Sequence, residues 1–169
     1  IRALDDETAQ MIRNAIYIAA NKSPTFRAAV DRYAGHNESN SSDTNVLMNK
    51  MKIFVVDSDH RAALGIANME NGNIYLVMPN IQKEDKDVGG QVVEFNGIKA
   101  SASLISTLTH EVGHVAMRYR DGKVGEDLQE GANQHFNHRV GKEIDPKNIN
   151  TPSIDGNGVP QYGSPLWSR

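Results

Sequence analysis

His110-Glu111-Val112-Gly113-His114 is the stretch that decides how this chain builds a site. Apolar residues recur around it at helical spacing and form one stripe, which consists of Leu104, Leu108, Val112, Val115 and Tyr119. This periodicity predicts a helix from about Ser101 to Arg120. Because His110 and His114 are four residues apart, their imidazoles lie on the same side of such a helix, roughly opposite the stripe.

A histidine pair at this spacing can bring two imidazole nitrogens to one metal ion, so we predict His110 and His114 as zinc ligands. Glu111 falls beside the pair, where its carboxylate would hold and deprotonate a metal-bound water molecule. Gly113 costs about 1 kcal/mol in a helix interior relative to Ala. Its presence predicts that another element passes close to the helix at this point.

The composition excludes several other kinds of site. The 169 residues include no cysteine, which removes disulfide scaffolds, thiol catalysis and cysteine-type zinc sites. A net charge of −3 does not predict the positively charged surface that binds nucleic acid. No apolar run approaches the roughly 20 residues that span a bilayer, so we expect no integral membrane protein. We expect a single domain over residues 1–169, and a chain that begins at Ile1 without a leader is expected to be a fragment of a longer one.

The amino-terminal part predicts two helices. Apolar residues at helical spacing follow an acidic first turn from Asp5 to about Ala20. Ser23-Pro24 is a second start signal, for a helix that ends at Gly35. Residues 36–45 are rich in Asn and Ser, which is typical of an exposed loop.

Strand patterns follow. Residues 51–56 are apolar and β-branched, and residues 62–68 and 73–78 flank Asn71-Gly72, which predicts a hairpin. Pro79 ends the second strand of that hairpin.

Two further segments precede the histidine motif. The polar residues 82–87, followed by Gly89-Gly90, are predicted to form a surface loop. Residues 91–95 are predicted as one more short strand, closed by Asn96-Gly97.

A helix is also predicted after the motif, from Glu126 to Arg139 and ending at Gly141. Catalytic zinc sites commonly combine three protein ligands with one water molecule, so this region must supply the third. The candidates are Glu126, Asp127, Glu130, His135 and His138. The tail beyond Asp145 is rich in Pro and Gly and is predicted to be irregular.

With the histidine motif, Gln129-Glu130-Gly131-Ala132-Asn133-Gln134 resembles the two-helix signature of the gluzincins, the thermolysin-like branch of the HExxH metallopeptidases. In that family the second helix carries an Asn-Glu-Gly-x-Ser-Asp type run whose Glu is the third zinc ligand. The resemblance implies that Glu130 is this ligand, ahead of Glu126, and that Gln129 and Gln134 orient the histidines. Gln134 departs from the family, which has an acid there. The spacing from His114 to Glu130 is also shorter than in the larger members, which implies a tight interhelical turn.

The resemblance covers about residues 51–141 and implies a compact, zincin-like α+β fold. Amino-terminal helices and a small, mostly antiparallel sheet with an edge hairpin would precede the HExxH helix and the Glu-bearing helix. Residues 73–77 resemble the edge strand on which zincins align an extended peptide, although an ordinary structural hairpin is the alternative. A donor for the oxyanion is also needed. We favour His138 and Tyr162 among candidates that include Tyr119, His135 and Arg139.

The activity expected is zinc-dependent hydrolysis of peptide bonds, with Zn2+ as cofactor and Glu111 as general base. The compact size, the fragment-like start and the lack of cysteine resemble metallopeptidase toxin domains at the carboxy terminus of larger bacterial delivery proteins. That likeness implies secretion or delivery to a target cell, a protein or peptide substrate, and an inhibitor or immunity protein as partner. The alternative is a non-proteolytic zinc-binding interaction module on the same scaffold.

Overall fold

The computed structural model describes residues 1, 3, 5–34, 52–57, 63–68, 72–87, 89–121, 126–146, 153–154 and 160–161, with the backbone alone at 32–34, 117–121, 126–132, 153–154 and 160–161. Over these residues the chain has an α+β fold. Its elements are, in order, α1 (Asp6–Lys22), α2 (Pro24–Ala34), β1 (Ile53–Val56), β2 (Gly65–Ala67), β3 (Ile74–Val77), α4 (Met78–Asp87), β4 (Val92–Phe95), β5 (Ile98–Ser101), α5 (Ala102–Asp121), α6 (Glu126–Ile144), β6 (Ser153–Ile154) and β7 (Pro160–Gln161).

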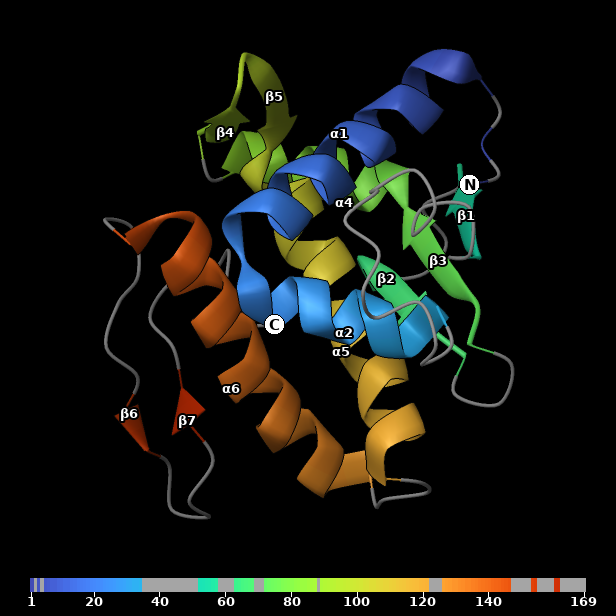
Figure 1. Ribbon diagram of the computed structural model, residues 1–169. Coiled ribbons are helices and arrows are strands. Elements are labelled where there is room, and N and C mark those ends of the chain that lie inside the picture. Colours follow the sequence, from blue (N-terminus) through green and yellow to red (C-terminus); the bar gives the residue numbers. More distant parts are fainter. Residues whose placement is uncertain are drawn as a thin grey trace.

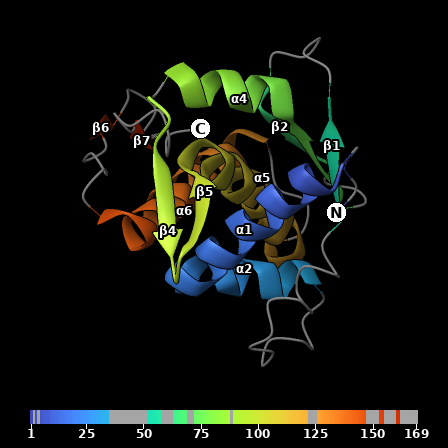
Figure 2. The same cartoon turned by 90° about the horizontal axis from the view of Figure 1, so that it is seen from above.

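Helix α5, which contains the histidine motif, lies at the centre of the fold (Figure 1). Figure 2 shows α4 on one side of α5 and α1 and α2 on the other. Helix α6 returns beside α5 in the opposite direction. The buried core joins these helices to the sheet and includes Ile12, Ile16, Phe26, Ile74, Leu76, Ile105, Leu108, Val112 and Val140. The apolar stripe predicted for α5 is therefore its core-facing side.

Side-chain caps begin the two amino-terminal helices, whose starts the sequence predicts near Asp5 and at Ser23-Pro24. The Asp5 carboxylate accepts a hydrogen bond from the backbone N–H of Thr8 at 2.6 Å. This bond favours the charged form and lowers the pKa of Asp5. Ser23 Oγ accepts a hydrogen bond from the backbone N–H of Phe26 at 3.0 Å, which starts α2 at Pro24.

The carboxyl end of α6 is bound to this same start of α2. Glu143 Oε1 accepts hydrogen bonds from Ser23 Oγ at 3.0 Å and from the Thr25 N–H at 3.1 Å. Its Oε2 accepts a third bond, from Thr25 Oγ1 at 3.0 Å. A carboxylate at a helix N-terminus also complements the helix dipole. The start of α2 and the last described helix are thereby joined through a polar contact.

The three-stranded sheet has the order β1-β3-β2, in which β3 pairs parallel with β1 and antiparallel with β2. The predicted hairpin is confirmed, because β2 and β3 are its two arms. The interpretation of residues 73–77 as an edge strand is wrong, since β3 lies in the middle of the sheet. The edge strand beside α5 is β2, as Figure 1 shows. Strand order depends on tertiary packing, which the alternation within one strand does not encode.

The predicted loop at residues 82–87 is wrong, because these residues belong to α4. Only Met78 and Ile81 are buried there, so the helix has too few apolar positions to show a periodic pattern. Its end is a Schellman motif, in which the N–H of Gly90 donates to the Asp85 carbonyl at 2.7 Å and that of Gly89 to the Lys86 carbonyl at 3.1 Å. Gly89 has φ 84° and Gly90 has φ 66°, a conformation that glycine adopts without strain.

The predicted strand at residues 91–95 is confirmed as β4, which forms a second hairpin with β5. The turn between them has positive φ at Asn96 (51°) and Gly97 (79°), as a tight Asn-Gly turn requires. Helix α5 then begins with a cap at Ser101, whose Oγ accepts a hydrogen bond from the Leu104 N–H at 3.1 Å.

The end of α6 differs from its prediction, because the helix continues through Gly141 to Ile144. Ile144 is buried one turn beyond Val140, and this packing outweighs the cost of a glycine inside the helix. The predicted helix end at Gly35, the loop at 36–45 and most of the tail lie outside the described residues. In the part of the chain that the structure describes, no helix has the length and apolar character to cross a bilayer.

Candidate metal centre

The two histidines of the motif converge. His110 Nε2 and His114 Nε2 are 3.1 Å apart, and the ring planes meet at 78°. Two imidazole nitrogens that share a tetrahedral zinc ion at its usual bond length are separated by about 3.3 Å. Both histidines are half-buried. The pair therefore fits a divalent metal ion with little rearrangement.

Helix α6 holds His110 at two points. Asn133 Nδ2 donates a hydrogen bond to the backbone carbonyl of His110 at 2.9 Å. One turn further along α6, Asn137 Nδ2 lies 2.8 Å from His110 Nδ1, the ring nitrogen that does not face His114. Asn133 is 0% exposed and Asn137 is 2% exposed, so both amides belong to the interface between the two helices.

Gly113 explains how α6 comes so close. A Cβ atom added at Gly113 would lie 2.7 Å from Phe136 Cδ1 and would also overlap Asn133 Oδ1. The prediction that another element passes close to Gly113 is therefore confirmed, and the element is α6. Glycine here permits the approach that brings Asn133 and Asn137 to His110.

Glu111 lies on the other side of the histidines, against β2. It is 6% exposed, and a Cβ atom added at Gly65 would lie 2.9 Å from Glu111 Cγ and 3.1 Å from Thr107 Cγ2. A cavity of about 150 Å³ opens here and is lined by Leu64, Gly65, Thr107, His110 and Glu111. The structure thus brings the predicted base and a predicted ligand to one cavity beneath the edge strand.

The pairing of β2 fixes which of its backbone groups face outward. The Val77 N–H donates to the Leu64 carbonyl at 2.9 Å, and the Asn68 N–H donates to the Asn73 carbonyl at 2.8 Å. Because alternate residues of an antiparallel strand bond to the same neighbour, the N–H and C=O groups of Gly65 and Ala67 point away from β3. Among the described residues, no further strand pairs with this edge.

The side chain of Glu130, the predicted third ligand, lies outside the described part of the chain. In that part of the chain, no group of three or more His, Cys, Asp or Glu side chains is close enough to hold a metal ion. Glu126, Asp127 and Glu130 stand on α6 where the backbone alone is described. His135 is exposed and His138 is half-buried.

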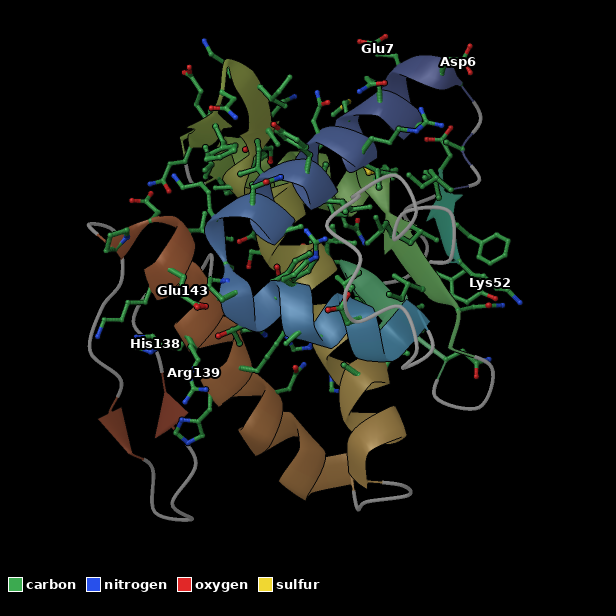
Figure 3. The ribbon with its side chains drawn as sticks, in the orientation of Figure 1. Asp6, Glu7, Lys52, His138, Arg139 and Glu143 are labelled. Atoms are coloured by element: carbon green, nitrogen blue, oxygen red, sulfur yellow. The ribbon has the colours of Figure 1, made fainter. Side chains whose placement is uncertain are left out.

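The predicted oxyanion donors are not brought to the histidine pair by any described contact. Figure 3 shows His138 and Arg139 on the side of α6 away from α5. Tyr162 and the side chain of Tyr119 lie outside the described part of the chain. Their role in catalysis therefore stays a prediction.

The contact between Asn137 and the His110 ring is the feature that sequence reasoning missed. The resemblance implied Gln129 and Gln134 for orienting the histidines. The Gln129 side chain is outside the described set, and Gln134 Oε1 is buried without a hydrogen-bond partner among the described residues. A signal did exist, because Asn137 follows Glu130 by seven residues and Asn133 by four, the spacing of one helix face.

Comparison of the chain with protein-family models, with curated proteins and with solved structures gave no match.

Proposed function

We propose that this chain is a zinc-dependent peptidase of the gluzincin type. The observation that carries the proposal is the convergence of His110 Nε2 and His114 Nε2, 3.1 Å apart, beside a cavity that Glu111 also lines. A histidine pair with a purely structural role would not need a neighbouring cavity that contains a nearly buried carboxylate.

Glu130 is proposed as the third ligand. It precedes Asn133 by three residues and Asn137 by seven, and both asparagines contact His110, so the three positions share one helix face. Because α6 runs opposite to α5, its residues before Asn133 are at the level of His114 rather than His110. Glu126 lies on the same face one turn earlier and is the alternative ligand.

The chemistry divides between the two sides of the site. A zinc ion, when bound, lowers the pKa of a water molecule and polarises the scissile carbonyl group. The Glu111 carboxylate accepts a proton from the attacking water molecule and passes it to the leaving amine. The outward N–H and C=O groups of Gly65 and Ala67 align the substrate as an additional strand. His138 and Tyr162 are the proposed donors for the oxyanion.

The test of the chemistry is Glu111→Gln, with Glu94→Gln on exposed β4 as the matched control. Loss of the base is expected to lower peptidase activity by about 10²–10⁴-fold, while zinc stays bound at one equivalent. Activity is measured with casein and a peptide library, and zinc by metal analysis after dialysis. Undiminished activity in Glu111→Gln would contradict the assignment. Zinc without turnover on varied substrates by the unaltered chain would favour the interaction module instead.

The ligand set is tested separately with Glu130→Gln and Glu126→Gln. The variant that lacks the true ligand is expected to bind zinc more weakly by more than about 100-fold. Loss of a residue that only contacts a ligand typically lowers the metal affinity 10–100-fold. The other variant keeps the affinity of the unaltered chain, and each thus serves as the control for the other. Unchanged zinc affinity in both variants would exclude Glu130 and Glu126 as ligands.

A further inference from the structure

A second cavity lies near the start of α5, before the histidine motif. Its volume is about 240 Å³, against about 150 Å³ for the cavity beneath β2, and the two cavities share no lining residue. Helix α1, the β4–β5 hairpin and the first turn of α5 supply its walls, which are formed by Met11, Val92, Lys99, Ala100, Ser101 and Leu104. The cavity is therefore separate from the candidate metal centre.

Most of the wall of this cavity is apolar. Leu104 is 1% exposed and Ala100 is 9% exposed, so they form its floor, whereas Val92 is 59% exposed and stands at the rim. Moving hydrocarbon from water onto such a wall is favourable. Since an apolar cavity of about 150 Å³ holds one benzene-sized molecule, the larger volume has room for a chain of about eight carbon atoms.

The polar groups at the cavity are hydrogen-bond donors. The Ala102 N–H donates to the Gln91 carbonyl at 2.9 Å. Because alternate residues of an antiparallel strand bond to the same neighbour, the N–H groups of Lys99 and Ser101 point away from β4. They face the side on which α1 lies, since β5 lies between β4 and α1 (Figures 1 and 2). The exposed Lys99 adds an ammonium group, and no carboxylate is among the lining side chains.

Two nearby carboxylates limit where an anion is favoured. Ser101 Oγ donates to Asp85 Oδ1 at 3.3 Å and accepts from the Leu104 N–H at 3.1 Å, so this hydroxyl is already engaged and the charge of Asp85 lies beyond it. Glu94 is the cross-strand neighbour of Lys99, but it is exposed, and salt and water screen its charge. An anionic group is therefore favoured at the Lys99 end of the cavity and not at the Ser101 end.

We propose that this cavity binds a straight-chain monocarboxylate of about eight carbon atoms. The hydrocarbon chain lies against Met11, Val92 and Leu104, and the carboxylate accepts hydrogen bonds from the ammonium group and the backbone N–H of Lys99. Hydrogen bonds to an ionised acceptor are stronger than those between neutral groups. Binding is non-covalent and needs neither a metal ion nor peptide hydrolysis, so the proposal is independent of the proposed function.

The experiment titrates the full chain with sodium butyrate, hexanoate and octanoate. The protein is first dialysed against a chelator, so that no carboxylate binds through a metal ion at the histidine pair. NMR resonances of the methyl groups of Met11, Val92 and Leu104 report occupancy of the cavity. The affinity is expected to rise about fourfold for each added methylene group. Octanol and octylamine carry the same chain on a neutral or cationic head group and should bind about three- to tenfold more weakly than octanoate.

The head-group contact is tested with Lys99→Met, which removes the charge and keeps most of the hydrocarbon stem. Lys83→Met on α4 is the matched control, because Lys83 is also exposed and does not line the cavity. Lys99→Met is expected to weaken octanoate binding about three- to tenfold and to leave octanol binding unchanged. The control should change neither affinity, and circular dichroism confirms that both variants are folded.

Several results would overturn the proposal. One is the absence of saturable shifts at the three methyl groups, and another is an affinity that does not rise with chain length. Octylamine that binds as tightly as octanoate would contradict the assigned charge. A change of less than twofold in octanoate affinity in Lys99→Met would contradict the assigned contact.

Discussion

The two sides of the candidate metal centre are built differently. On the α6 side the helices are in direct contact at Gly113, and the buried amides of Asn133 and Asn137 hold His110 at its backbone and ring. On the β2 side the strand also approaches closely, at Gly65, but leaves a cavity of about 150 Å³. We infer from this difference that the packed side would fix the proposed ligands and that the open side would admit the proposed substrate. Changes on the two sides should therefore have different effects.

The largest effect is expected from Gly113→Ala on the packed side. The added Cβ overlaps Phe136 and Asn133, and overpacking of this kind costs about 1–3 kcal/mol. We expect a lower free energy of unfolding in urea and weaker zinc binding together, because α6 must move away from His110. Helix propensity alone predicts the reverse, a gain of about 1 kcal/mol for Ala. A variant more stable than the unaltered chain would therefore show that the contact is not tight.

Gly65→Ala on the open side should separate activity from stability. The new methyl group would lie 2.9 Å from Glu111 Cγ and displace the base, and small displacements of catalytic groups can cost up to about 10²-fold in rate. We expect kcat/KM to fall at least about tenfold, while zinc affinity and the melting temperature change little. Ile66→Val, at the next residue of β2, is the control. A parallel loss of zinc in Gly65→Ala would mean that the two sides are not independent.

The smallest effect on stability is expected from Asp31→Asn on α2, a residue that belongs to neither the α6 side nor the β2 side of the site. Burial raises the pKa of the Asp31 carboxyl above its ordinary 3.8, although the charge of Arg27 lowers it in part. Because the folded state disfavours the charged form, the contribution of Asp31 to stability falls as pH rises through its folded pKa. The variant should be more stable by roughly a few tenths of a kcal/mol at pH 7, because the residue is only partly buried, although its Oδ1 atom is buried without a hydrogen-bond partner among the described residues.

The gain in Asp31→Asn should disappear near pH 3, where the carboxyl is protonated in both states. Urea unfolding at the two pH values measures it, and zinc affinity should be unchanged at pH 7. An equal gain at both pH values would show that the cause is packing and not charge.

Local patterns in the sequence predicted those parts of the structure that local chemistry determines. The motif helix, the helix starts near Asp5 and at Ser23-Pro24, the hairpin of β2 and β3, and the strand that Asn96-Gly97 closes each depend on neighbouring residues. Helix α4 was not predicted from the sequence, because it buries only Met78 and Ile81. The position of β2 at the edge and the contact of Asn137 with His110 depend on how distant segments meet. The sequence spacing places Asn137 on the helix face of Glu130 and Asn133, but it does not tell whether that face meets solvent or an imidazole ring.

The bridge from Glu143 to Ser23 and Thr25 joins segments about 120 residues apart in the chain. The position of α6 therefore depends partly on the start of α2, which is far from the histidine motif in the sequence. A truncated chain that starts at α5 would keep every candidate ligand but would lose this anchor, along with the apolar cover from α1 and α2. The minimal unit able to assemble the proposed metal centre therefore includes the amino-terminal helices, and an isolated α5–α6 pair should not form it.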